Sequence, residues 1–269
     1  MNKKSKKVDS KKSISKLIQQ IIQVSNRKNN PKEIIDDIIQ LTFNCVFSGG
    51  FQYADNLHVQ YWVDQSLLRE LTEYKTDLEA WELLKEATMI FIELHKKSEP
   101  FTDIIGEMYD EYLGQVLGQF LTPSDLATAL ASITLALGGN NQITSHTVIG
   151  DTCGCGAGSL VLGSLRVIYQ TQGKEALKHL EIVNMDLDSR MVQLSSIQIV
   201  LHCMFHGLEI NSLNTHWGNT LTEYGGRKDG SSTMAVYWKS NRNSLSYSCE
   251  VIGMEEKDDY KEYTEKKYA

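Results

Sequence analysis

Apolar residues recur every three or four positions through the first 120 residues, which is the spacing of amphipathic helices. The pattern predicts helices over residues 13–26, 31–48, 63–74, 77–97 and 102–117. Pro31 fits a helix start, and the Gly49-Gly50 pair fits a helix end. No alternating pattern typical of a strand interrupts these stretches, so we expect this region to be all-helical.

The pattern changes after residue 120, where short apolar runs begin to alternate with helical stretches. Thr122 is a suitable N-cap, Pro123 suits the first helical position and Asp125 resembles a capping box, which together predict a helix over 123–137. The runs that follow predict strands at 147–151, 181–186, 213–217 and 233–238, with a weaker one at 246–253, and helices at 159–172 and 189–206. Strands separated by such helices form parallel βαβ units, so the fold class is α/β.

This organisation divides the chain into three parts. Residues 1–117 form a helical region, 118–254 an α/β domain and 255–269 a charged tail. The lysine-rich residues 1–12 are expected to be disordered, either as a solubilising tail or as an arm that contacts DNA phosphates.

The stretch TVIGDTCGCGAGSL at 147–160 carries the strongest candidate chemistry. A predicted strand ends in Asp151, three glycines follow at Gly154, Gly156 and Gly158, and a helix begins after them. Glycines allow close backbone approach, and the helix start offers free N–H groups, so the turn suits a nucleotide-like ligand. A tight turn without a ligand is the alternative. The carboxylate of Asp151 would repel a pyrophosphate but suits a cationic group, which favours S-adenosylmethionine over a dinucleotide.

The spacing of these glycines also departs from the dinucleotide motif G-x-G-x-x-G. The sixth position falls on Ser159 when counting starts at Gly154, and on Val161 when it starts at Gly156. A nicotinamide-dependent oxidoreductase is therefore disfavoured.

A second acidic residue, Asp186, ends the next predicted strand. Parallel strands place Asp151 and Asp186 at one sheet edge, where ligands of open α/β sheets bind. There Asp186 can accept hydrogen bonds from both hydroxyls of a ribose, although capping is the alternative role. Asp188 fits the N-cap of the following helix.

Composition indicates the cellular environment of the chain and the kinds of site it can contain. The chain has 269 residues, a net charge of −7 and five cysteines, an odd number that suggests a reducing, cytoplasmic environment. No apolar run is long enough to cross a membrane. Cys153 and Cys155, and the pair His202 and His206, lack the further ligands that a metal site needs, so we expect no metal.

These residues together resemble the N6-adenine DNA methyltransferases, most closely the modification subunits of type I restriction enzymes and their phage or plasmid relatives. The similarity begins with GEMYDEY at 106–112, continues with GQFLTP at 118–123 and the glycine-rich turn, and extends to THWGNTL at 215–221. It implies a truncated class I (Rossmann-like) methyltransferase domain with a mostly parallel sheet, following a helical N-terminal domain.

The resemblance implies S-adenosylmethionine as cofactor. It carries cofactor binding onto Phe120, Thr122, Pro123, Asp151, Cys153, Gly154, Gly156, Gly158, Asp186, Asn219 and Leu221. The chain departs from the family's D-P-x-C-G-x-G turn at Thr152, which replaces a proline. The spacing leaves two cysteine–glycine pairs as possible equivalents, Cys153-Gly154 and Cys155-Gly156.

The family's catalytic [N/D/S]-P-P-[Y/F/W] motif is missing, because no proline follows Pro123. At the expected place, Trp238 offers a stacking surface and Ser240 or Asn241 a polar group. Few residues remain after this point for further strands or a DNA-reading domain.

Two functions follow from the resemblance. The first is a DNA adenine-N6 methyltransferase of restriction–modification type, compact or acting with a partner subunit. The alternative is a catalytically inactive relative that serves as a partner or decoy for such a system. Expected partners are DNA and a protein subunit or a second copy of the chain, with no membrane.

Overall fold

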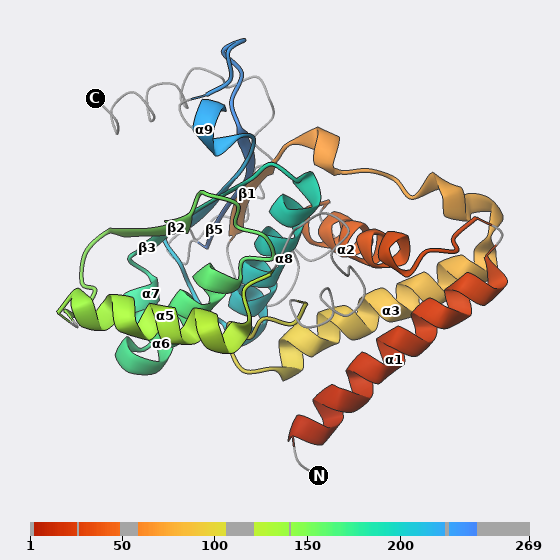
Figure 1. Ribbon diagram of the computed structural model, residues 1–269, viewed down its shortest axis with the longest axis horizontal. Helices are drawn as coiled ribbons and strands as arrows, with labels where there is room; N and C mark the ends of the chain where they lie inside the picture. The colour runs from red at the N-terminus through yellow and green to blue at the C-terminus, as the bar shows by residue number, and fades with distance from the viewer. Residues whose placement is uncertain are drawn as a thin grey trace.

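A five-stranded sheet lies at the centre of the computed structural model, which describes residues 3–25, 27–48, 59–105, 121–139, 141–223 and 226–240 (Figure 1). The strand order is β1-β5-β4-β3-β2. The strands are β1 (Val59–Val63), β2 (Thr147–Asp151), β3 (Leu180–Asp186), β4 (Ser212–Trp217) and β5 (Met234–Ser240).

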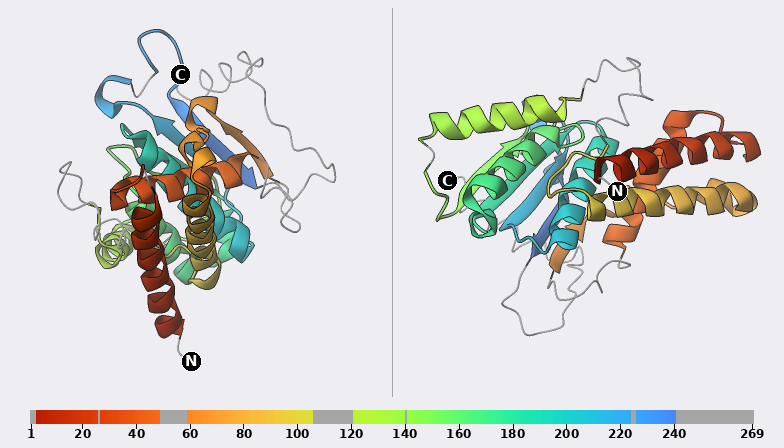
Figure 2. Two further views of the ribbon diagram at one scale, coloured as in Figure 1. Left: turned by 90° about the vertical axis from the view of Figure 1, so that its right-hand side faces the viewer. Right: turned by 90° about the horizontal axis from the view of Figure 1, so that it is seen from below.

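Helices from both ends of the described chain pack around this sheet. They are α1 (Lys3–Val24), α2 (Pro31–Phe47), α3 (Leu78–Lys97), α5 (Ser124–Leu137), α6 (Ser159–Gln172), α7 (Lys174–Leu177), α8 (Ser189–His206) and α9 (Thr220–Glu223), with short 3₁₀ helices η1 (Gln65–Leu67) and η2 (Thr72–Thr76). Figure 2 shows α5 and α6 together at one end of the molecule, α1 and α3 at the other, and α8 between them.

Three neighbouring strands, β2, β3 and β4, run parallel, as the sequence predicts. The predicted helices over 159–172 and 189–206 coincide with α6 and α8. Asp188 caps α8 by accepting a hydrogen bond from the backbone N–H of Arg190, and Gly207 ends the helix in a left-handed conformation. The alternation of strands and helices therefore gives this part of the fold correctly.

The expectation of a mostly parallel sheet is wrong for the remaining strands. β5 pairs antiparallel with β4, and β1 pairs antiparallel with β5. A parallel crossover normally requires a helix long enough to span the sheet. In its described residues the connection from β4 to β5 has only the four-residue helix α9. The chain therefore turns back beside β4.

The expectation that the first 120 residues are all-helical is also wrong. Residues 59–63 form the edge strand β1, with Tyr61 and Val63 buried, and the helix predicted over 63–74 is replaced by η1 and η2. Asp64 accepts a hydrogen bond from the N–H of Ser66 and so begins η1 directly after the strand. Five residues of β1 are too few for an alternating pattern to stand out among helices.

Helix boundaries differ from the prediction at two places. α1 begins at Lys3, inside the segment predicted to be disordered. α5 begins at Ser124 with Pro123 at the N-cap, so Thr122 does not have the predicted capping position. Proline at that position offers no side-chain acceptor, and no side-chain hydrogen bond caps this helix.

Several predictions lie outside the described residues. They are residues 106–117 of the helix predicted over 102–117, the domain boundary between 117 and 118, the strand at 246–253 and the tail at 255–269. Residues 102–105 of that predicted helix are described and are not helical. In the described part, β1 joins the same sheet as the α/β strands, so part of the N-terminal region belongs to the sheet.

The helical N-terminal region docks on α8 through polar contacts. Arg190 forms an ion pair with Asp36 of α2 at 2.9 Å, and the Gln193 side chain donates to Gln40 at 3.1 Å. The apolar side chains of both regions belong to a single buried cluster. The helices and the sheet therefore form one continuous core.

None of the helices in the described residues has both the length and the apolar character that a membrane span requires.

Candidate functional site

The carboxyl ends of β2 and β3 meet at one edge of the sheet, as parallel pairing requires. Asp151 pairs in register with Asn184 of β3, and Asp186 ends β3 two residues further on. The glycine-rich loop, residues 152–158, leaves β2 at this edge and leads into α6. The two acidic residues singled out in the sequence therefore border the same loop.

The backbone of this loop has three glycines in the left-handed region, where other residues are strained. The φ angles are +107° at Gly154, +53° at Gly156 and +84° at Gly158. Gly158 also packs closely on α8, since a Cβ placed there would lie 3.2 Å from Cβ of Ser195. Glycine is required here for both conformation and space.

Asp186 fastens the loop to β3. Its Oδ2 accepts a hydrogen bond from the N–H of Gly156 at 2.9 Å, and its Oδ1 accepts from the N–H of Asp188 at 2.8 Å. The N–H groups of Gly154 and Cys155 donate to the carbonyl of Met185 just before it. An ionised carboxylate has about four acceptor positions, so each oxygen of Asp186 retains one for a further donor.

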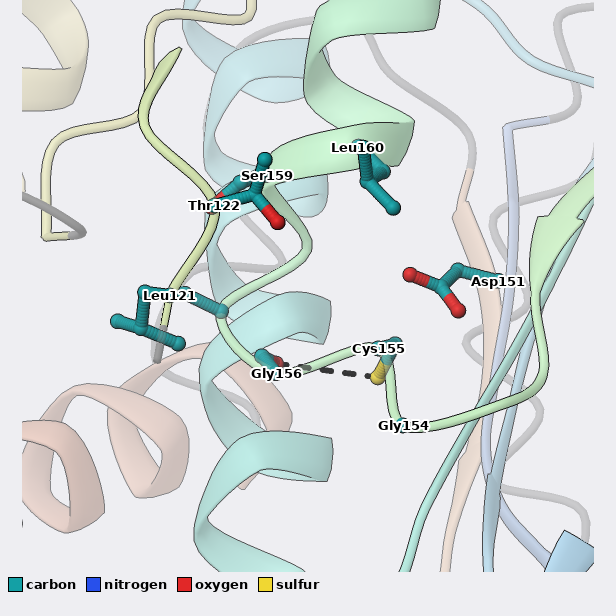
Figure 3. Close-up of a pocket in the computed structure, with 9 residues that line it drawn as sticks. Leu121, Thr122, Asp151, Gly154, Cys155, Gly156, Ser159 and Leu160 are labelled. Atoms are coloured by element: carbon teal, nitrogen blue, oxygen red, sulfur yellow. Dashed lines mark hydrogen bonds between the residues drawn. The ribbon is translucent and has the colours of Figure 1, made fainter. Parts of the chain in front are cut away.

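A small cavity of about 70 Å³ opens above the loop (Figure 3). The side chain of Asp151 faces it from the β2 side, and Leu121 and Thr122 lie on the opposite side. The residues lining it are Leu121, Thr122, Asp151, Gly154, Cys155, Gly156, Ala157, Ser159 and Leu160. Pockets for whole ligands usually measure about 300–1,000 Å³. This cavity has room for one end of a nucleoside-sized molecule, and the rest would lie on the adjoining surface.

Burial raises the pKa of Asp151 above its usual range, and the neighbouring charge of Asp186 adds to the shift. A hydrogen bond from the N–H of Cys153 to Asp151 Oδ1, at 3.3 Å, opposes it. A carboxylate in this situation gains from a cation placed beside it. The predicted contact of Asp151 with the positively charged part of a ligand stays a prediction.

A buried polar network supports the loop from beneath. The Gln198 side chain of α8 donates to the carbonyl of Ala157 at 2.8 Å and to Asp103 Oδ1 at 3.2 Å, and it accepts from the N–H of Ile104 at 2.8 Å. Ser159, the first residue of α6, donates to Asp103 Oδ2 at 2.6 Å. The network joins residues 101–105 to the glycine-rich loop.

Sequence reasoning missed Asp103 and Gln198, because no local motif marks them. Gln198 is 95 positions from Asp103 and 41 from Ala157, its hydrogen-bond partners. It also missed Leu121, Ser159 and Leu160, although they lie within the two motifs it identified, at 118–123 and 147–160. Their place in those motifs was the signal that could have identified them as lining residues.

The predicted cofactor residues are only partly gathered at the cavity. Thr122, Asp151, Gly154 and Gly156 line it, whereas Pro123, Cys153 and Gly158 lie beside these residues in the chain. Asp186 is buried, at 8% exposure, and is not among the lining residues. Phe120 lies outside the described residues. Of the cysteines, Cys155 is buried and lines the cavity, and Cys153 is exposed.

Two of the predicted cofactor residues, Asn219 and Leu221, lie shortly after β4. The Asn219 side chain accepts a hydrogen bond from the N–H of Leu221 at 2.9 Å, so it stabilises its own turn. Leu221 is 94% exposed. The hydroxyl of Thr220 donates to the carbonyl of Thr152, which connects this turn to the glycine-rich loop.

The candidate catalytic residues are not brought to the site. Because β5 runs antiparallel to β4, its end lies at the edge of the sheet opposite the glycine-rich loop. Trp238 is 2% exposed and belongs to the core, and the Ser240 hydroxyl donates to the carbonyl of Ile210 near the start of β4. Asn241 lies outside the described residues. A stacking role for Trp238 therefore does not fit this arrangement.

Among the residues that the structure describes, no group of three or more potential metal ligands is found. His202 and His206 stack on each other with ring centroids 5.7 Å apart, and each has a ring nitrogen in contact with a backbone carbonyl.

A profile of the N-6 DNA methylase family matches residues 101–237. This chain belongs to the N-6 DNA methylase family. The matched region begins at the segment that Gln198 binds and includes the glycine-rich loop, strands β2 to β4 and the first part of β5. Family membership implies S-adenosylmethionine as the cofactor.

Three solved structures are similar to this chain at low sequence identity. One is a putative class I S-adenosylmethionine-dependent methyltransferase from Listeria monocytogenes, with a TM-score of 0.44, 10% identity and coverage of 80% of this chain and 56% of that one. Another is a type I restriction–modification methyltransferase subunit from Streptococcus thermophilus, with a TM-score of 0.38, 18% identity and coverage of 78% and 44%. A third is a DrdV–DNA complex, with a TM-score of 0.41, 13% identity and coverage of 82% and 24%.

The chain thus spans about half the length of the first two structures and about a quarter of the third. A search of curated proteins finds no match. The family assignment rests on the profile match.

Proposed function

We propose that this N-6 DNA methylase family member binds S-adenosylmethionine at the glycine-rich loop and contributes to adenine-N6 methylation of DNA in a restriction–modification system. The observation that carries the proposal is the pair of strand-tip carboxylates at the glycine-rich loop: Asp151 lines the cavity, and Asp186 is fixed by two backbone N–H groups at the tip of β3. A rigid carboxylate beside an open glycine backbone suits a ribose.

The residues present fit this cofactor in three respects. Asp186 would accept hydrogen bonds from the ribose hydroxyls, and Asp151, whose pKa is raised by burial, would gain from the positive charge of the cofactor. The loop glycines keep side chains out of the space above the backbone. When bound, S-adenosylmethionine supplies a methyl group activated by its sulfonium.

In this proposal, the described residues form the binding site for the cofactor. The chain's own contribution there is to bind, orient and partly desolvate the ligand, and no protein group forms a covalent bond. Trp238 and Ser240 lie at the far sheet edge, so we propose that the pocket for the target adenine is completed with a partner subunit, which would also contact DNA.

Isothermal titration calorimetry of the chain with S-adenosylmethionine tests cofactor binding. We expect Asp186→Ala to weaken binding by about tenfold or more, the effect of a lost charged hydrogen bond. Asp186→Asn keeps an oxygen for the N–H of Gly156 but loses the charge and the acceptor for the N–H of Asp188. A similar loss of affinity in this variant, at an unchanged melting temperature, would assign the effect to the cofactor and not to loop collapse.

Asp188→Ala is the matched control, because this neighbouring acid is already bound to Arg190 at 2.6 Å and caps α8. Its affinity for the cofactor should match that of the unmodified chain. Unchanged affinity in Asp186→Ala would refute the role of Asp186, and failure to bind either S-adenosylmethionine or its demethylated product would refute the proposal.

A tritiated-methyl transfer assay on adenine-containing DNA then addresses the reaction. Transfer by the isolated chain would refute the requirement for a partner subunit. Cofactor binding without transfer by the isolated chain is the result that our proposal expects, and the inactive relative named above predicts the same. Transfer on addition of the cognate subunits separates the two.

A further inference from the structure

The turn after β4, residues 217–220, contacts the ends of the two strands that border the cavity. The indole N–H of Trp217 donates to the carbonyl of Leu187, just after β3, at 3.1 Å. The hydroxyl of Thr220 donates to the carbonyl of Thr152, just after β2. The turn therefore connects the two places where the chain leaves the parallel strands beside the cavity.

Each of these carbonyls belongs to a peptide group whose N–H binds a carboxylate. The peptide group that follows Thr152 donates its N–H to Oδ1 of Asp151 at 3.3 Å. The peptide group that follows Leu187 donates its N–H to Oδ1 of Asp186 at 2.8 Å. Both acids thus form a turn in which an aspartate binds the backbone two residues further on. The same construction occurs at both strand ends, with a donor from the turn after β4 on the carbonyl side of each peptide group.

A hydrogen bond to the carbonyl of a peptide group has two effects on its N–H. It fixes the plane of the peptide, and it polarises the amide, so that the N–H becomes a stronger donor. We propose that Trp217 and Thr220 are positioning residues, which act through these two peptide groups to orient the carboxylates of Asp186 and Asp151 toward one ligand. Under the function proposed above, on which this role rests, that ligand is S-adenosylmethionine.

The turn is itself fixed from the β5 side of the sheet. The backbone N–H of Trp217 donates to the carbonyl of Thr233, just before β5, at 2.8 Å. The Arg227 side chain donates to the carbonyl of Trp217 at 2.9 Å, and its guanidinium lies 6.0 Å from the centre of the indole ring. The N–H of Gly218 donates to the carbonyl of Asp186 at 3.0 Å. The donors of the turn are therefore held in place before a ligand binds.

The role of Thr220 has a consequence for the charge on Asp151. Burial raises the pKa of Asp151 and the charge of Asp186 adds to the shift, whereas the N–H of Cys153 opposes it. Cys155 also interacts with Asp151, but burial raises the pKa of its thiol, which therefore stays neutral. Because the Thr220 hydroxyl strengthens the one hydrogen bond that favours the ionised form, its loss should raise the pKa of Asp151 further.

Isothermal titration calorimetry with S-adenosylmethionine over a series of pH values tests this role. Thr220→Val removes the hydroxyl and keeps the β-branched shape, so affinity should fall about fivefold, the effect of one neutral hydrogen bond. The pH below which affinity is lost should also move upward, because Asp151 would then ionise at a higher pH. Thr220→Ser keeps the hydroxyl and should restore both the affinity and the pH dependence.

Trp217→Phe tests the other peptide group, because the ring remains and the N–H to Leu187 is lost. Its affinity should fall by a similar factor, but the pH dependence should stay that of the unmodified chain, since this series of bonds ends on Asp186. Thr222→Val is the matched control, the same replacement at an exposed position of the same short helix, α9. It should change neither the affinity nor the pH dependence.

Hydrogen–deuterium exchange without ligand distinguishes a failure of this role from a failure of the proposed function. The N–H groups of residues 153–156 all donate to β2 or β3, and they should exchange faster in Thr220→Val than in Thr222→Val. If the unmodified chain does not bind S-adenosylmethionine, the proposed function fails and the exchange rates alone decide whether the turn holds the loop. Equal exchange in the two valine variants would overturn the inference, and so would an unchanged affinity and pH dependence in Thr220→Val.

Discussion

The sheet has two parts that differ in strand direction. Strands β2, β3 and β4 run parallel and bring Asp151, Asp186 and the glycine-rich loop to one edge. Strands β5 and β1 run antiparallel, and the end of β5 lies at the opposite edge. Apolar residues of both parts fill the core, but only the parallel part brings its acidic strand ends to the glycine-rich loop.

The strongest test of this comparison is Trp238 in β5. Because its side chain is buried in the core, Trp238→Ala should lower the free energy of unfolding by about 3–5 kcal/mol, measured by urea denaturation. Trp238→Phe keeps most of the packing and should bind S-adenosylmethionine as the unmodified chain does. A large loss of affinity in the phenylalanine variant would place Trp238 in the site and contradict the separation of the two parts.

A smaller effect is expected where the two parts meet, at His216 of β4. Burial lowers the pKa of His216 to about 4, and the register between β4 and β5 shifts at this residue. In the unfolded chain the pKa of this histidine is near 6.5, so the unfolded state binds the proton more readily than the folded state. The contribution of neutral His216 to the free energy of unfolding is therefore fully present above pH 6.5 and is lost as the pH falls from 6.5 toward 4.

The full contribution of this histidine corresponds to about 3 kcal/mol. In His216→Asn the loss of stability between pH 6.5 and pH 4 should shrink by about that amount. Denaturation curves at both pH values measure it. An unchanged pH dependence would show that His216 is as accessible to protons when folded as when unfolded.

The smallest effect concerns Asp151, at the end of β2. Its pKa is raised in the folded chain, so its stabilising contribution is present at low pH and is lost as the pH rises through the folded pKa. At neutral pH the ionised group therefore destabilises the fold. Asp151→Asn should raise the melting temperature and yet weaken S-adenosylmethionine binding, and a lower melting temperature would contradict this account.

Sequence patterns predict the parallel part well because its information is local. The apolar runs before Asp151 and Asp186, and the helices between them, lie within about two residues of their predicted positions. The glycines and the acid of each strand tip follow from the chemistry of a βα turn. The residues that line the cavity therefore lie within the two predicted motifs, at 118–123 and 147–160.

The direction of β5 and the existence of β1 could not be predicted in the same way. An alternating strand has the same pattern whichever way it runs, so Trp238 suits either edge of the sheet. The choice depends on the connection after β4 and on pairing with β1, whose partner residues lie far away in the sequence. The bonds of Gln198 with Asp103 and Ala157 are equally non-local.

The Gln198 network has a consequence for ligand affinity. The carbonyl of Ala157 and the N–H of Ile104 are held by one buried amide, so the floor of the glycine-rich loop is already ordered before any molecule arrives. Preorganisation of this kind reduces the entropy lost on association. Residues 101–105, far from the cavity in sequence, thereby strengthen binding at a site that they do not line.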